Sequence, residues 1–108
     1  MNKKQRAWIH CRINSNSPRE LMNFQYQELL KVAETKNMIV QGVSRVVSNG
    51  EILNGFEYES LLTSIRRKNF DVLLIYSPLR ISTNPNVYDE FKIYCHLYNV
   101  SIISLEDI

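Results

Sequence analysis

The sequence predicts an α/β domain in which a mainly parallel sheet of four or five strands lies between helices on both faces. Residues 72–76 form a continuous apolar block of strand length, which is typical of a strand buried on both faces inside a parallel sheet. Segments with helical hydrophobic periodicity alternate with short β-favouring segments, and connections of this length allow successive strands to run parallel. The expected three-layer arrangement has a flavodoxin-like strand order, in which the first and third strands are neighbours.

Each expected element is bounded by polar or turn-forming residues. The predicted strands cover residues 7–12, 38–46, 71–77 and 101–104. The predicted helices cover residues 18–36, 57–68 and 87–98. The helices are supported by apolar side chains that recur every three or four residues along one face.

The expected helix starts depend on capping residues. Ser17 is suited to the N-cap of the first helix, Pro18 to its first position, and Glu20 completes a capping box three residues after the cap. For the third helix, Asn84 and Asn86 are alternative caps on either side of a proline. Ser17 therefore predicts a first helix that begins at Pro18.

Composition places the chain among ordinary globular proteins. Its 108 residues suffice for one domain over 1–108, and 44% hydrophobic with 22% charged residues is typical of such a domain. A formal net charge of +2 is too small to indicate a nucleic-acid binder by itself. Cys11 and Cys95 lack metal-ligand spacing, so we expect no metal site, no cofactor and a cytoplasmic location.

Two arginines follow the strands that should be neighbours. Arg12 ends the first strand and Arg80 follows the third, so both should lie at the edge of the sheet where ligands bind in open α/β folds. Together with the loop that carries Ser15 and Ser17, just before a helix, they predict an anion site, most simply for phosphate. The alternative is a pair of solvated arginines at strand ends.

Four stretches, in order and spacing over residues 7–105, resemble the catalytic domain of the resolvase/invertase serine recombinases. Residues 11–15 are similar to the family's C-R-V-S-T, and residues 25–33 to its Q-x-x-x-L-x-x-x-A helix. Residues 71–82 resemble D-V-V-L-V-Y-K-L-D-R-L-S, and residues 98–105 resemble H-G-V-E-L-I-S-L. The resemblance implies an enzyme that cuts and rejoins DNA through a phosphoserine link.

Carried over residue by residue, the resemblance implies an impaired site. It retains Arg12 and Arg80 and leaves Ser15 as a displaced hydroxyl, so catalytic roles are implied for these three residues. Asn14 takes the place of the nucleophile, although it has no hydroxyl or thiol to form an ester with phosphorus. Leu79 replaces the aspartate in the D-R-L-S part of the family pattern at residues 71–82. Thr83 replaces the arginine that follows this pattern in the family, and the arginine of the family's D-R-P-G sequence before the second helix is absent.

The family reading implies DNA as a partner, bound weakly or through a recombinase subunit, and possible assembly with a second copy. Compared with that family, we expect no DNA-binding domain within these residues. No apolar run approaches the ~20 residues of a membrane helix, so we expect no membrane association. A second hypothesis is a small flavodoxin-like anion-binding or regulatory domain unrelated to DNA. His10 has no carboxylate or histidine at motif spacing, which favours a structural role. Cys11, inside the first strand, is expected to be a buried small hydrophobe.

Overall fold

One parallel sheet with helices on both faces makes up the protein, in a computed structural model that describes residues 4–51 and 54–107. The strands are β1 (Arg6–Ile13), β2 (Ile39–Val47), β3 (Val72–Ile75) and β4 (Ser101–Ser104). The helices are α1 (Glu20–Thr35), α2 (Phe56–Arg66) and α3 (Pro85–Leu97). Two 3₁₀ turns, η1 (Pro78–Arg80) and η2 (Leu105–Asp107), follow β3 and β4.

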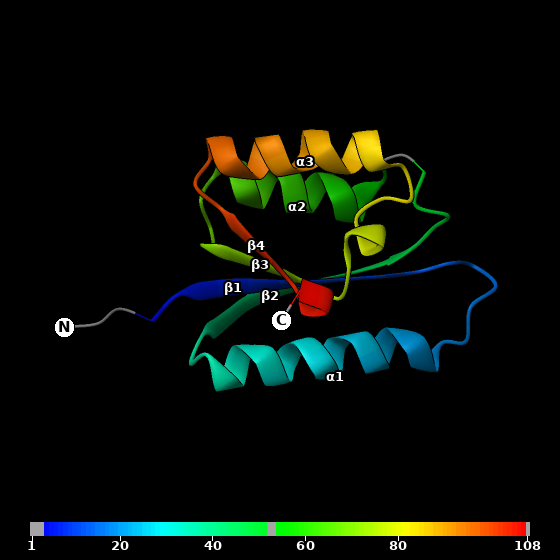
Figure 1. Ribbon diagram of the computed structural model, residues 1–108, viewed down its shortest axis with the longest axis horizontal. Coiled ribbons are helices and arrows are strands. Elements are labelled where there is room, and N and C mark those ends of the chain that lie inside the picture. The colour runs from blue at the N-terminus through cyan, green and yellow to red at the C-terminus, as the bar shows by residue number, and fades with distance from the viewer. Residues whose placement is uncertain (1–3, 52–53, 108) are drawn as a thin grey trace.

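The strand order is β2-β1-β3-β4, and every neighbouring pair is parallel. The predicted flavodoxin-like order is confirmed, because β1 and β3 pair directly, with His10 opposite Ile75. Their carboxyl ends therefore reach the same edge of the sheet, which is on the right in Figure 1.

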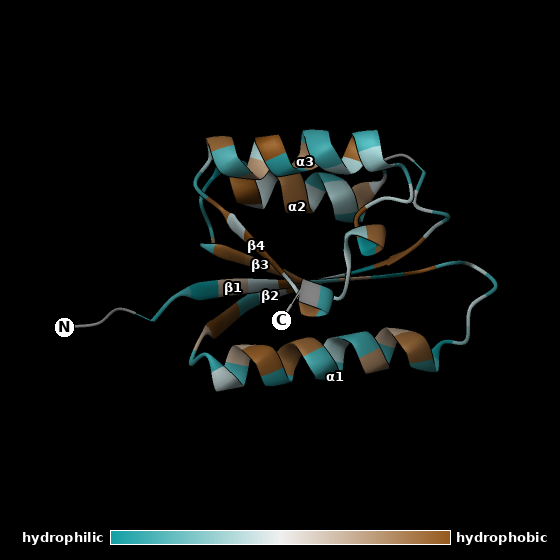
Figure 2. Cartoon of the chain, viewed as in Figure 1, coloured by the Kyte–Doolittle hydropathy of each residue, from teal (hydrophilic) through white to brown (hydrophobic). Residues whose placement is uncertain are grey.

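Alternation along the strands divides the core into two layers. Ala7, Ile9 and Cys11 of β1 pack on the side of α1, in a cluster that includes Leu29 and Ala33. Residues of β3 face both layers, and this strand is hydrophobic throughout in Figure 2. The other layer lies under α2 and α3, which both cover the face opposite α1 (Figure 1).

The capping box predicted for the first helix is wrong. Helix α1 begins at Glu20, and its N-cap is Arg19, which makes no side-chain cap hydrogen bond. Ser17 instead closes a turn by donating its backbone N–H to the Asn14 carbonyl at 3.0 Å. This turn precedes the helix, which therefore begins two residues later than predicted. At α3 the structure selects Asn84 between the two alternatives, since its side chain accepts a bond from the backbone N–H of Asn86.

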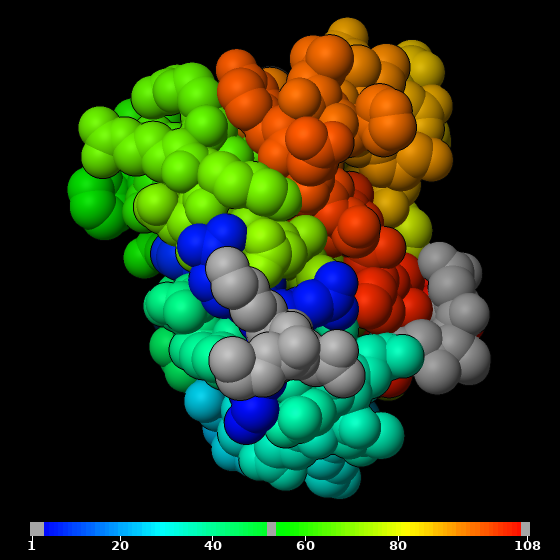
Figure 3. Space-filling view, turned by 90° about the vertical axis from the view of Figure 1, so that its left-hand side faces the viewer, coloured from blue at the N-terminus to red at the C-terminus, as the bar shows by residue number. Residues whose placement is uncertain are grey.

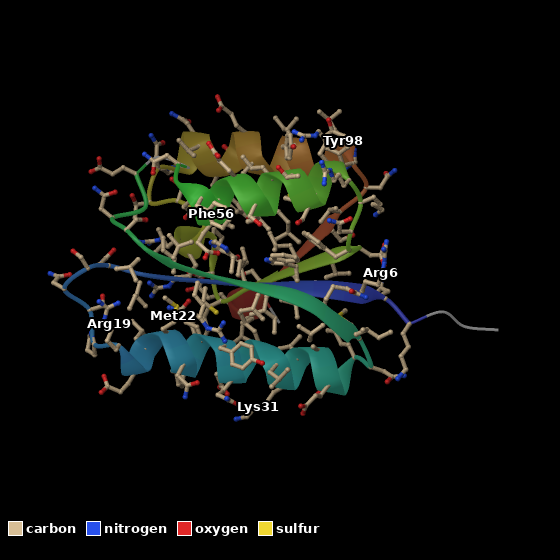
Figure 4. The ribbon with its side chains drawn as sticks, turned by 180° about the vertical axis from the view of Figure 1, so that it is seen from behind. Arg6, Arg19, Met22, Lys31, Phe56 and Tyr98 are labelled. Atoms are coloured by element: carbon tan, nitrogen blue, oxygen red, sulfur yellow. The ribbon has the colours of Figure 1, made fainter. Side chains whose placement is uncertain are left out.

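The amino edge of the sheet, where the strands begin, is closed by an ion pair. Figure 3 shows this edge, with the residues at the start of β1, in blue, lying between α1 below and α2 and α3 above. Arg6 donates from Nη2 to Asp71 Oδ1 at 3.0 Å and from Nε to Oδ2 at 3.2 Å. Arg6 and Arg19 lie at opposite ends of the molecule in Figure 4, so this pair is remote from the carboxyl edge.

Candidate anion site at the carboxyl edge of the sheet

Three segments meet where β1 and β3 end. They are the turn at residues 14–17, the loop at residues 48–51 after β2, and η1 with the residues that follow it. The last two are tied together, because Ser82 Oγ donates to the Gly50 carbonyl at 2.8 Å and the Thr83 backbone N–H donates to the same carbonyl at 2.7 Å. The predicted site residues all belong to this edge.

Arg12 joins the three segments. Its side chain leaves β1 near the strand's end, and the residue is only 2% exposed. Nη1 donates to Asn14 Oδ1 at 2.9 Å and to the Ser48 carbonyl at 2.7 Å, while Nη2 donates to the Leu79 carbonyl at 2.7 Å. The guanidinium thus holds one residue of each segment.

The positive charge of Arg12 is not neutralised by a carboxylate. Its acceptors are amide and carbonyl oxygens, and among the described residues no ion pair includes Arg12. Burial lowers the pKa of Arg12, the Tyr58 hydroxyl opposes that change, and nearby Arg80 lowers the pKa further. Arginine nevertheless stays protonated in proteins, so the edge carries a buried cation.

Gly50 makes room for this cation. A Cβ on Gly50 would lie 2.6 Å from Arg12 Cζ, and the glycine has a φ of +77°. Both the contact and the backbone conformation require a residue without a side chain. Ser48, Asn49 and Gly50 are turn-forming residues of the kind that end a strand, but nothing in their sequence indicates that the loop packs on an arginine.

Gln25 of α1 fixes the backbone of Arg12. It is buried, its Oε1 accepts from the Arg12 backbone N–H at 3.2 Å, and its Nε2 donates to the Arg12 carbonyl at 2.9 Å. The three buried residues of α1 are Gln25, Leu29 and Ala33, which are the positions of the Q-x-x-x-L-x-x-x-A pattern. In that pattern Leu29 and Ala33 pack against the sheet, and Gln25 bonds to the backbone of Arg12 near the end of β1.

Arg80, the last residue of η1, lies beside Arg12 and is partly buried. Its Nη1 donates to the Arg12 carbonyl at 3.2 Å, and its Nε is buried without a partner among the described residues. The structure thus brings the two predicted arginines together. Arg80 makes fewer bonds to the protein than Arg12, so it has more donors free for a ligand.

The turn at residues 14–17 is mostly exposed. Asn14 and Ser15 are exposed, and Ser17 is half-buried. Asn14 accepts from Arg12, at the position where the family resemblance places the nucleophile. Ser15 lies in the middle of the turn, one residue further from the arginine pair in sequence.

The buried guanidinium of Arg12 and the partly buried one of Arg80, close to an exposed turn, can attract and bind an anion. Guanidinium donors match the oxygens of phosphate or carboxylate. Among the described residues no group of acidic, histidine or cysteine side chains could hold a metal ion. No helix in the described part of the chain is long and apolar enough to cross a membrane.

Solved structures with the same fold include serine recombinases. The chain is similar to the C-terminal catalytic domain of ISC1926 TnpA, an IS607-like serine recombinase (TM-score 0.87, 21% identity, 95% of this chain and 71% of that one). It is also similar to the N-terminal catalytic domain of TP901-1 integrase (TM-score 0.85, 22% identity, 95% and 78%). A resolvase family site-specific recombinase from Streptococcus pneumoniae aligns with a TM-score of 0.82, 14% identity and coverage of 96% and 74%.

No protein-family model matches the sequence, and no curated protein matches it. The three-dimensional likeness is nevertheless close over nearly the whole chain. The protein therefore has the fold of serine recombinase catalytic domains, as the sequence resemblance predicted.

Proposed function

We propose that this chain is a serine recombinase catalytic-domain-like module that acts in DNA recombination and is impaired in strand cleavage. The observation that carries the proposal is the contact between Arg12 and Asn14 at the end of β1. Asn14 occupies the position where the family resemblance places the nucleophile, and its side chain bonds to Arg12. An asparagine side chain cannot attack phosphorus.

The other half of the site supports the same conclusion. Arg80 is retained and offers a guanidinium for a DNA phosphate, with Ser15 and Ser17 on the adjoining turn. Leu79, where the family has an aspartate, is 57% exposed, and Thr83 has no charge. The module keeps groups that attract phosphate and lacks groups that would form and stabilise the covalent intermediate.

As partners we propose DNA, contacted weakly through Arg80 and the buried charge of Arg12, and recombinase subunits of similar fold. Binding without cleavage would let the module occupy a place in a recombination complex. Such an arrangement would regulate the complex rather than carry out strand exchange.

A covalent-adduct assay tests the proposal. The full chain is fused to the DNA-binding region of a serine recombinase of known target site and incubated with that site. We expect no protein–DNA adduct from the unmutated domain. We expect an adduct from a variant that carries Asn14→Ser, Leu79→Asp and Thr83→Arg together, because groups that act as a unit restore little when replaced singly.

Two results would contradict the proposal. An adduct from the unmutated fusion that disappears on Ser15→Ala would identify Ser15 as an active nucleophile. If the triple variant forms no adduct and Arg80→Gln leaves DNA affinity unchanged, the alternative anion-binding domain unrelated to DNA is favoured. Arg66→Gln, which removes an exposed arginine at the far end of α2, is the matched control for charge.

A further inference from the structure

Three consecutive backbone carbonyls, at residues 79–81, are each bound by a buried side chain from another part of the fold. This segment carries Arg80, and a single 3₁₀ turn cannot satisfy its own last carbonyls. The bonds, in chain order of the carbonyls, come from Arg12 Nη2 at 2.7 Å, His10 Nε2 at 3.2 Å and Tyr58 Oη at 2.7 Å.

The middle carbonyl belongs to Arg80 itself, and its contact with His10 fixes the tautomer of the imidazole. A carbonyl oxygen only accepts, so the proton of neutral His10 must be on Nε2. Burial lowers the pKa of His10 to about 4, so the ring is neutral at neutral pH and its Nδ1 is an acceptor.

Ser44 on β2 completes the arrangement. Its Oγ lies 2.6 Å from His10 Nδ1, and the indole Nε1 of Trp8 donates to the same oxygen at 3.2 Å. Since the indole only donates, the Ser44 hydroxyl accepts from Trp8 and is free to donate to His10. Hydrogen bonds therefore run in one direction from Trp8 through Ser44 and His10 to the Arg80 carbonyl.

We infer that His10 is a positioning residue for Arg80, which holds the backbone of η1 so that the Arg80 guanidinium is aimed at an anion. The inference rests on the proposed function for the role of Arg80 as a phosphate ligand. The contacts support it because the side chain of Arg80 has one long bond of its own, 3.2 Å to the Arg12 carbonyl, so its direction depends on its backbone.

The first test uses the unmutated chain and needs no ligand. Nitrogen-15 NMR of the histidine side chains reports which ring nitrogen of His10 carries the proton. We expect the Nε2–H form, and an Nδ1–H form would overturn the inference, since that ring could not donate to Arg80.

The second test compares His10→Gln with His10→Asn. Gln places its amide N–H near the position of Nε2 and can still donate to the Arg80 carbonyl, whereas Asn is one methylene shorter and cannot reach it. The measurement is nitrogen-15 relaxation of the Arg80 Nε–H group, with the Arg66 signal as an internal reference. We expect increased motion of Arg80 in the Asn variant and rescue in the Gln variant; equal order in all three proteins would overturn the inference.

Binding of inorganic phosphate, measured on the same samples, separates this inference from the proposed function. We expect the Asn variant to bind roughly fivefold more weakly than the unmutated chain, as for the loss of one hydrogen bond, and the Gln variant to bind normally. If the unmutated chain binds no phosphate, the anion site fails, while Arg80 order still decides whether His10 positions it. Phosphate affinity that is unchanged by His10→Asn would count against positioning.

Discussion

The two ends of β1 carry arginines that are held in opposite ways. Arg6, at the amino edge, forms a two-pronged ion pair with Asp71, and the two side chains are 38% and 30% exposed. Arg12, at the carboxyl edge, is 2% exposed and bonds only to neutral oxygens. Arg6 is paired with a carboxylate and is close to water, whereas Arg12 is buried and has no carboxylate partner among the described residues.

The difference indicates which edge of the sheet can recruit an anion. A carboxylate at Arg6 already occupies the place that a phosphate would take. At Arg12 neutral amide and carbonyl oxygens accept from Nη1 and Nη2, while Nε has no partner among the described residues. These dipoles leave a positive potential that Arg80 increases. A buried charge without a counter-ion is costly in a folded protein, and such groups cluster at functional sites.

The largest expected effect distinguishes the two arginines by stability. Arg12→Met should lower the free energy of unfolding by about 3 kcal/mol, because a buried side chain and its part-buried hydrogen bonds to the Ser48 and Leu79 carbonyls are lost. Arg6→Met removes a more exposed pair and should have the smaller effect. Denaturant unfolding followed by circular dichroism measures both, and equal losses would show that Arg12 is not a structural centre.

The second effect concerns the room that Arg12 needs. Gly50→Ala should destabilise the protein by about 2 kcal/mol more than Gly55→Ala, as for overpacking a filled site. Both glycines have positive φ, +77° and +90°, but a Cβ on Gly55 meets nothing within 4 Å. Gly55→Ala is therefore a control for backbone strain alone, and similar unfolding midpoints for the two variants would contradict the packing of the loop on Arg12.

The layers of this fold could be predicted because the signals for them are local. Residues 72–76 predicted a buried strand, and apolar side chains that recur every three or four residues predicted the helix faces. The element order and the parallel pairing are confirmed. The start of α1 was predicted wrongly, because Ser17 satisfies the local rules for a cap but is used to close the turn with Asn14.

The partners of the site residues could not be predicted, because they are distant in sequence. Arg12 bonds to carbonyls 36 and 67 residues away, and backbone carbonyls carry no sequence signature. The position of His10 under Arg80 likewise depends on how β1 and β3 align. The sequence indicated which residues would meet at the carboxyl edge; what each one bonds to required the structure.

The third effect is on ligand binding. Arg80→Gln should weaken binding of a short duplex DNA by roughly fivefold and reduce the slope of log affinity against log salt by about 1, as for one lost phosphate contact. Arg6→Gln should leave both quantities unchanged, because Arg6 is already paired. Fluorescence anisotropy over a salt series measures them, and an equal effect of the two substitutions would remove the distinction between the edges.

The smallest effect is the pH dependence of the Asp71 ion pair at the amino edge. Hydrogen bonds from Arg6 lower the pKa of Asp71 from 3.8 to about 2. The unfolded chain therefore binds the Asp71 proton first as the pH falls, and the stabilisation by this carboxylate is complete above about pH 5 and lost as the pH approaches 2.

Asp71→Asn should accordingly be less stable than the unmutated chain at pH 6, and the two should converge near pH 2. Asp89→Asn, at an exposed aspartate of α3, is the control for loss of a carboxylate away from Arg6. The deficit of Arg12→Met should persist at pH 2, because the carbonyl and amide oxygens that hold Arg12 do not titrate. A deficit of Arg12→Met that also disappeared in acid would mean that a carboxylate stabilises Arg12, and that both ends of β1 are neutralised alike.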